Sequence, residues 1–155
     1  MLKKTLAIAS ATLLFVFIAS AKARPEIPHK TPERLAKAAT HIAVGEVVRI
    51  YSVEEKETNW RYTRYVAELR VEAVEKGEEF SAGELLYVRW FSRRYRGGTP
   101  PTSSNGYYGV TPSSGDRVRA YLARNAHDGF NPDNMDGGYN VLIPNGFEKL
   151  APAGR

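Results

Sequence analysis

The chain has 155 residues, with 22 lysines and arginines against 17 acidic residues, and a formal net charge of +5. It contains no cysteine, which excludes disulfides, thiol catalysis and metal sites built from thiolates. A hydrophobic core alone must therefore hold the fold together, and the length suits a single domain.

The first 23 residues have the features of a secretion signal. Two lysines precede the uncharged apolar run TLAIASATLLFVFIAS, which is shorter than the roughly 20 residues of a membrane-spanning helix. Ala21 and Ala23 then supply the small residues of a cleavage site. We expect cleavage after Ala23, with an uncleaved membrane anchor as the alternative. The protein would then be secreted or periplasmic, and would meet a membrane only through the signal before cleavage.

The charge of the mature chain argues against nucleic acid as a partner. Loss of Lys3, Lys4 and Lys22 leaves 19 basic and 17 acidic residues, a net charge of +2 over residues 24–155. The high charge of the whole chain thus comes partly from the signal, and it does not indicate nucleic-acid binding.

Residues 24–39 predict an extended arm followed by a short helix. Thr31 is a typical N-cap, and Pro32 suits the first position of a helix that would run to about Ala39. Residues 40–155 predict a single β-domain.

Strand patterns fill most of residues 40–155. In the stretch from His41 to Tyr51, a bulge or a sharp bend is expected at Gly45 and Glu46. The residues expected to share the core face of this strand are Ile42, Val44, Val48 and Ile50. A charged connector, Ser52 to Asn59, would lead to an alternating strand from Trp60 to Val74.

A third strand is predicted within Gly83 to Arg96, GELLYVRWFSRRYR, with Leu86, Val88 and Trp90 facing the core. Further strands are expected over Asp116 to Ala123 and Tyr139 to Ile143, separated by irregular loops from Arg96 to Gly115 and from Arg124 to Gly138. The pattern predicts a mainly β fold: a small five-stranded, OB-like antiparallel barrel with one short helix and two long loops. A β-sandwich is the alternative.

Three segments occur in an order that resembles the netrin-type, tissue-inhibitor-of-metalloproteinase-like OB-fold family, in a bacterial secreted form. They are HIAVGEVVRIYSV, AELRVEAVEKGEEFSAGELLYVRW and GDRVRAYLARN, within Thr40 to about Ala123. The animal inhibitors chelate zinc with an N-terminal cysteine, whereas this chain has no cysteine and its expected mature N-terminus is Arg24. The resemblance therefore implies a fold and a tendency to bind proteins, and no inhibitory residue carries over.

The outward face of the third predicted strand is the first candidate binding surface: Tyr87, Arg89, Phe91, Arg93 and Tyr95. Aromatic rings interleaved with arginines suit stacking and contact with acidic partners. Arg117 and Arg119 would widen this surface if their strand were its neighbour. The structural alternatives are ordinary cross-strand pairs with Glu68 and Glu72, or a second core beneath the long loop.

Two loops carry further candidates. Tyr107 and Tyr108 resemble an adaptable binding loop, although one of them could simply anchor the loop. The segment from His127 to Asp136 is rich in oxygen ligands but does not match a known calcium loop, and Asx-turns explain it without metal. The three histidines share no metal-ligand spacing, and no G-x-S-x-G motif is present.

These observations predict a secreted, non-enzymatic binding module that contacts a protein or an extracellular polymer and uses no cofactor. A structural or subunit-assembly domain is one alternative. A small metal-dependent hydrolase that uses the loop from His127 to Asp136 is the other.

Overall fold

The computed structural model describes residues 27–99, 106–124 and 138–152. The predicted secretion signal and the segment from His127 to Asp136 lie outside the described residues. Within the described part of the chain, no helix has the length and apolar character of a membrane span. The elements are α1 (Pro32–Ala38), β1 (His41–Lys56), β2 (Trp60–Lys76), β3 (Leu85–Tyr95), β4 (Arg117–Arg124), β5 (Tyr139–Val141) and β6 (Phe147–Lys149).

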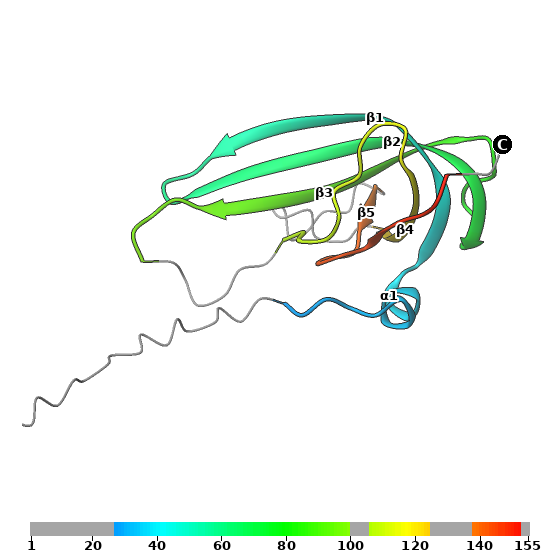
Figure 1. The fold of residues 1–155 in the computed structure, drawn as a ribbon, viewed down its shortest axis with the longest axis horizontal. Coiled ribbons are helices and arrows are strands. Elements are labelled where there is room, and N and C mark those ends of the chain that lie inside the picture. Colours follow the sequence, from blue (N-terminus) through cyan, green and yellow to red (C-terminus); the bar gives the residue numbers. More distant parts are fainter. Residues whose placement is uncertain (1–26, 100–105, 125–137, 153–155) are drawn as a thin grey trace, which may run out of the picture.

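Five strands close into a barrel in the order β1-β2-β3-β5-β4, and β4 pairs back with β1 (Figure 1). The predicted five-stranded barrel with one short helix is thus confirmed. One detail of the prediction is wrong, because the barrel is mixed: β5 runs parallel to β3, with Val88 opposite Tyr139. The expected final strand, β5, is shorter than predicted. After a turn that contains the cis Ile143–Pro144 bond, β6 pairs with the next part of β4.

The barrel core is built from alternate residues of the long strands. Leu86, Val88 and Trp90 of β3 are buried in it, as the sequence predicts. The predicted apolar face of β1 is only partly right: Ile50 packs against the barrel core, but Ala43 and Val47 line that core and Ile42 belongs to a second cluster. The register between β1 and β2 shifts at three places along this stretch, and each shift changes which side chains face inward.

A bend at Gly45 accompanies these shifts. A Cβ atom at this position would overlap the backbone carbonyl oxygen of Arg70 on β2. Only glycine allows so close an approach of the two strands, so the expectation of a bulge or bend at Gly45 is confirmed.

The three long strands extend past the barrel as a projecting ribbon (Figure 1). The predicted connector from Ser52 to Asn59 is wrong, because β1 continues to Lys56 and turns directly into β2. Its charged residues fit a strand because they face opposite charges across the ladder. Glu54 lies 3.5 Å from Arg61, and Glu55 lies 3.7 Å from Arg64.

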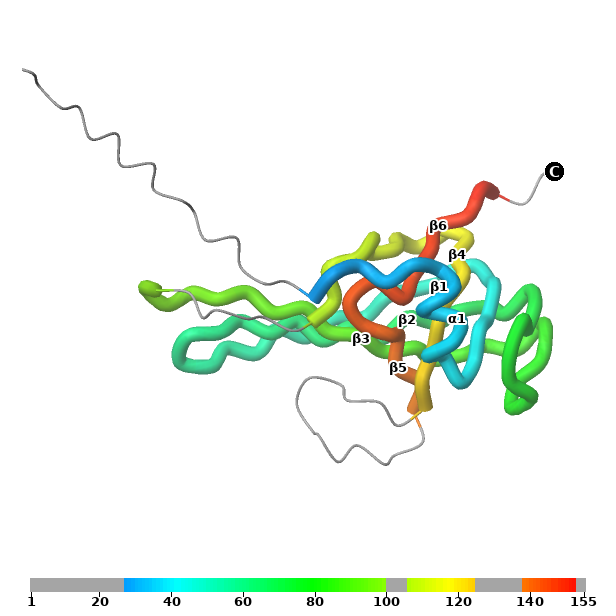
Figure 2. Tube along the Cα trace, turned by 90° about the horizontal axis from the view of Figure 1, so that it is seen from below, coloured from blue at the N-terminus to red at the C-terminus, as the bar shows by residue number. Residues whose placement is uncertain are grey.

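The short helix packs where β1 and β4 meet (Figure 2). It begins as predicted, with the backbone N–H of Arg34 donating to the Thr31 hydroxyl at 3.4 Å. Leu35 and Ala39 then form a small second core with Ile42 and Tyr121. The helix therefore packs against the barrel, and the ribbon projects from the barrel away from the helix (Figure 1).

Candidate functional site

The outward face of β3 is divided between exposed and buried side chains. Tyr87 is 54% exposed, whereas Phe91 is only 2% exposed. The backbone N–H of Tyr107 donates to the Phe91 carbonyl at 2.9 Å, and Gly106 lies beside the Phe91 ring. The expectation that Phe91 belongs to an exposed binding surface is therefore wrong, because the end of the long loop packs over it.

Arg89 serves the contact between β3 and β5. Its Nε donates to the side-chain oxygen of Asn140 at 3.1 Å, and its guanidinium group lies against Gly138. Asn140 is itself only 2% exposed. Arg89 thus satisfies the hydrogen-bonding need of the buried Asn140 in the barrel wall. Its role is therefore structural, unlike that of the exposed residues further along β3.

At the far end of the ribbon, the aromatic–arginine pattern extends from β3 onto β2. Trp60 lies opposite Tyr95, and Tyr62 lies opposite Arg93. The Arg93 guanidinium carbon is 4.4 Å from the centroid of the Trp60 ring, and the Tyr95 ring meets Trp60 edge-on at 5.0 Å. We call the following residues the ribbon tip: Trp60, Tyr62, Arg93, Arg94, Tyr95 and Arg96. Sequence patterns did not single out Trp60 and Tyr62, although alternation along β2 places them on the same face as Arg64 and Glu68.

Three arginines of the ribbon tip have no acidic partner among the described residues. Among the described residues, no carboxylate lies within ion-pair distance of Arg93, Arg94 or Arg96. Arg94 and Arg96 are exposed, and Arg93 is half-buried with its Nε lacking a hydrogen-bond partner. The ribbon tip therefore combines uncompensated positive charge with aromatic rings.

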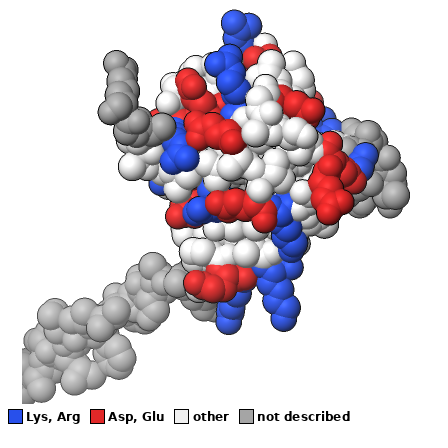
Figure 3. Space-filling view, turned by 90° about the vertical axis from the view of Figure 1, so that its right-hand side faces the viewer, with Lys and Arg blue, Asp and Glu red and all other residues white. Residues whose placement is uncertain are grey.

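Several charged residues of the barrel, by contrast, form ion pairs. Arg117 binds Glu72 at 2.6 Å, and Arg119 binds Glu75 at 2.7 Å and Glu148 at 2.8 Å. Figure 3 shows acidic and basic side chains interleaved over this end of the molecule. The condition under which Arg117 and Arg119 would widen the arginine surface is not met, since β4 pairs with β1, β5 and β6 and not with β3.

Among the described residues, two hollows adjoin the ribbon tip. One, of about 270 Å³, is lined by Glu57, Thr58, Asn59, Trp60, Tyr95 and Thr99. The other, of about 360 Å³, lies nearer the barrel and is lined by Glu54, Arg61, Thr63, Ser92, Arg93, Arg94, Arg96, Tyr107 and Tyr108. The first hollow combines two aromatic rings with hydroxyl, amide and carboxylate groups, so it can contact both apolar and polar parts of a ligand.

The two loop tyrosines have different roles. The Tyr107 hydroxyl is buried, donates to the Val110 carbonyl at 2.9 Å and accepts the backbone N–H of Phe147 at 3.3 Å. Burial raises the pKa of Tyr107 well above its usual value. Tyr107 therefore anchors the loop to the core, which is the structural alternative considered for this pair. Tyr108 is half-buried at the rim of the larger hollow.

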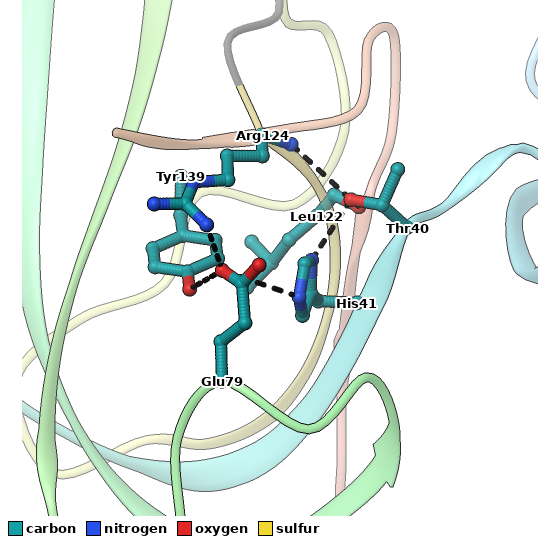
Figure 4. A network of polar contacts seen from close by, with 6 residues as sticks. All are labelled: Thr40, His41, Glu79, Leu122, Arg124 and Tyr139. Carbon is teal, nitrogen blue, oxygen red and sulfur yellow. Dashed lines mark hydrogen bonds and ion pairs between the residues drawn. The ribbon is translucent and has the colours of Figure 1, made fainter. Parts of the chain in front are cut away.

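A polar network that sequence patterns do not predict joins the start of β1 to β4, β5 and the connection between β2 and β3 (Figure 4). The Glu79 carboxylate accepts from the Tyr139 hydroxyl at 2.7 Å, pairs with Arg124 and lies 3.7 Å from Nε2 of His41. The hydrogen bond from Tyr139 and then that from Arg124 lower the pKa of Glu79. Nδ1 of His41 shares a hydrogen bond of 2.9 Å with the Thr40 hydroxyl. These residues lie far apart in the chain, so no local motif identifies them.

The network looks structural because each member already has protein partners. A carboxylate bound by a tyrosine and an arginine is poorly placed to accept a further proton from a substrate. In the part of the chain that the structure describes, no group of three histidine, aspartate or glutamate side chains could hold a metal ion. The calcium interpretation of the segment from His127 to Asp136 concerns residues outside that part.

Comparisons with protein-family models, curated proteins and solved structures found no match. The resemblance to the netrin-type family therefore stays a prediction, and the function has to be argued from the chain's own geometry.

Proposed function

We propose that this protein is a secreted, non-enzymatic binding module whose ribbon tip contacts a protein or an extracellular polymer. One observation carries the proposal. Among the described residues, Arg93, Arg94 and Arg96 are neighbours without an acidic partner, whereas Arg117, Arg119 and Arg124 of the barrel are each paired with a glutamate. Neighbouring like charges destabilise a fold when nothing compensates them, so an unpaired arginine group is more easily understood as a surface for an external anion.

The position of the ribbon tip supports the same reading. The ribbon projects beyond the barrel, so a partner can reach the tip without displacing the core (Figure 1). All of its residues except Arg96 lie on paired strands, and rigid elements position contact groups more accurately than free loops do. In small barrels of this general type, strands 2 and 3 often carry the binding face, although fold alone does not establish function.

Subunit assembly is a second candidate, and the outer edge of β1 favours it. Among the described strands, none pairs with this edge from Arg49 to Lys56. Tyr51 is 45% exposed and Val53 is 62% exposed along it. An open edge with apolar side chains can pair with another chain, although the charged residues Glu54, Glu55 and Lys56 oppose uncontrolled association.

A comparative pull-down from the medium in which the native host grows tests the proposed function. The baits are the wild-type protein, the tip variant Arg93→Gln/Arg94→Gln and the control variant Lys37→Gln/Arg70→Gln. Lys37 and Arg70 are exposed residues of α1 and β2 outside the ribbon tip, so the control removes the same charge. We expect a partner that the wild type and the control retain and the tip variant loses. An identical partner set for all three baits would contradict the proposal.

A further inference from the structure

We propose that the ligand of the ribbon tip is an acidic polysaccharide, with a sugar ring in the hollow beside Trp60 and anionic substituents on the arginines. This inference rests on the proposed function and specifies its ligand class. It is carried by three features of the described residues: the composition of the hollow, the placement of the unpaired arginines and the burial of neighbouring rings.

The hollow at the ribbon tip has the composition that sugar binding requires. A pyranose ring has an apolar C–H face and an edge of hydroxyl groups, so its site needs an aromatic surface next to hydrogen-bonding groups. Trp60 and Tyr95 supply the aromatic surface. The groups able to bond hydroxyls line the same hollow: Glu57, Thr58, Asn59 and Thr99. Arg93 packs against the Trp60 ring and helps to hold it in place.

The arginines extend from this hollow along the chain. The larger hollow is lined by Arg93 and Arg94, which belong to β3, and by Arg96, which directly follows that strand. At about 3.3 Å per residue, the stretch from Arg93 to Arg96 spans roughly 10 Å, a length comparable to a short oligosaccharide. Guanidinium groups bind carboxylate or sulfate groups through paired hydrogen bonds. Alternation along β3 directs Arg93 to the face of Tyr95 and Arg94 to the opposite face, so an anionic polymer in the aromatic hollow would contact Arg93 directly and reach Arg94 and Arg96 across the edge of β3.

Single-stranded nucleic acid fits less well. Proteins that bind it use a series of exposed aromatic rings on which successive bases stack. Phe91 and Tyr62, which continue the line of rings towards the barrel, are 2% and 9% exposed. Only Trp60 and Tyr95 then remain at the hollow. An acidic protein surface would use the arginines but would leave the hydroxyl-binding groups of the hollow without a role.

Binding to defined polymers tests this inference. The folded protein is immobilised, and polygalacturonate, neutral dextran, polyglutamate and single-stranded DNA are passed over it at low ionic strength. The variants are Arg93→Gln/Arg94→Gln, Trp60→Ala and the control Lys37→Gln/Arg70→Gln, each checked for a native circular dichroism spectrum. We expect polygalacturonate to bind most tightly. Both tip variants should weaken that binding by at least about tenfold, and the control should leave it unchanged.

The outcomes separate this inference from the proposed function. Equal or tighter binding of polyglutamate or DNA, with no dependence on Trp60, would overturn the polysaccharide ligand and leave the ribbon tip as a binding surface. Loss of polygalacturonate binding in the arginine variant but not in Trp60→Ala would also overturn the sugar-ring contact. If no polymer binds, the inference fails, and the pull-down alone then decides the proposed function.

Discussion

The guanidinium carbon of Arg93 lies 4.4 Å from the centroid of the Trp60 ring. This contact links the end of β3 to the first residue of β2. This cation–π contact is made far from the core, so it orders the ribbon tip without supporting the barrel. Exposed contacts of this kind contribute about 0.5–1 kcal/mol. We predict a coupling energy of that size between Arg93→Gln and Trp60→Ala in a double-mutant cycle, measured by urea unfolding. A coupling near zero would mean that the contact does not hold Trp60 in place.

Phe91 and Tyr87 should respond very differently to truncation. Phe91→Ala removes a buried ring, and we expect it to lower the free energy of unfolding by about 3–5 kcal/mol. Tyr87→Ala, at an exposed position of the same strand, should change it by less than about 0.5 kcal/mol. Denaturant titration of the two variants measures both. Similar small effects would show that Phe91 belongs to a surface after all.

The burial of Phe91 shows where prediction from sequence ends. The alternation along β3 correctly places Leu86, Val88 and Trp90 in the core, because one face of a barrel strand must be apolar. The same alternation puts Phe91 outside, and it cannot show that Gly106 and Tyr107, from the long loop, return to cover the ring. Periodicity describes one strand at a time, whereas loop packing depends on the whole fold.

The ribbon tip was only half predictable for a related reason. Arg93 and Tyr95 stand out on their own strand, but the pairing of Tyr95 with Trp60 depends on the register between β2 and β3. That register is set by the connection between Lys76 and Leu85, whose conformation the alternation pattern does not give. The charges of Glu54 and Glu55 suggested a connector because their partner arginines lie on the neighbouring strand.

Gly45, the single glycine of β1, should not tolerate a side chain. Substitution by alanine places a Cβ atom onto the Arg70 carbonyl, so the two strands must move apart. Overpacking of this kind costs about 1–3 kcal/mol, and we expect Gly45→Ala to lower the free energy of unfolding by that amount. Gly98→Ala is a suitable control, since a Cβ there meets nothing within 4 Å. Equal stability of the two variants in thermal unfolding would contradict the tight contact between β1 and β2.

The network around Glu79 predicts a loss of stability in acid. Hydrogen bonds from Tyr139 and Arg124 lower the pKa of Glu79 in the folded state. Its contribution is therefore present above the unfolded pKa of about 4.3 and is lost as the pH falls through the lower folded value. Wild type should exceed Glu79→Gln in melting temperature at pH 7, and the difference should shrink as the pH falls below about 4. A difference independent of pH would contradict this assignment.

Tyr139 predicts the corresponding loss at high pH. Burial and then the hydrogen bond to Glu79 raise the pKa of Tyr139 to about 12. Its neutral form is favoured by folding, so this contribution is complete below about pH 10 and is lost as the pH rises towards 12. Tyr139→Phe should lack this part of the alkaline destabilisation. An unchanged alkaline unfolding profile in Tyr139→Phe would show that the hydroxyl contributes nothing to it.

The most direct test of the ribbon tip as the binding surface is the dissociation constant for polygalacturonate, measured by calorimetry on matched variants. Arg93→Gln/Arg94→Gln should bind at least about tenfold more weakly than the wild type, and added salt should weaken the wild type more than this variant. Lys37→Gln/Arg70→Gln, which loses the same charge elsewhere, should match the wild type. Equal weakening in the two double variants would contradict a site at the ribbon tip and would point to attraction by overall charge alone.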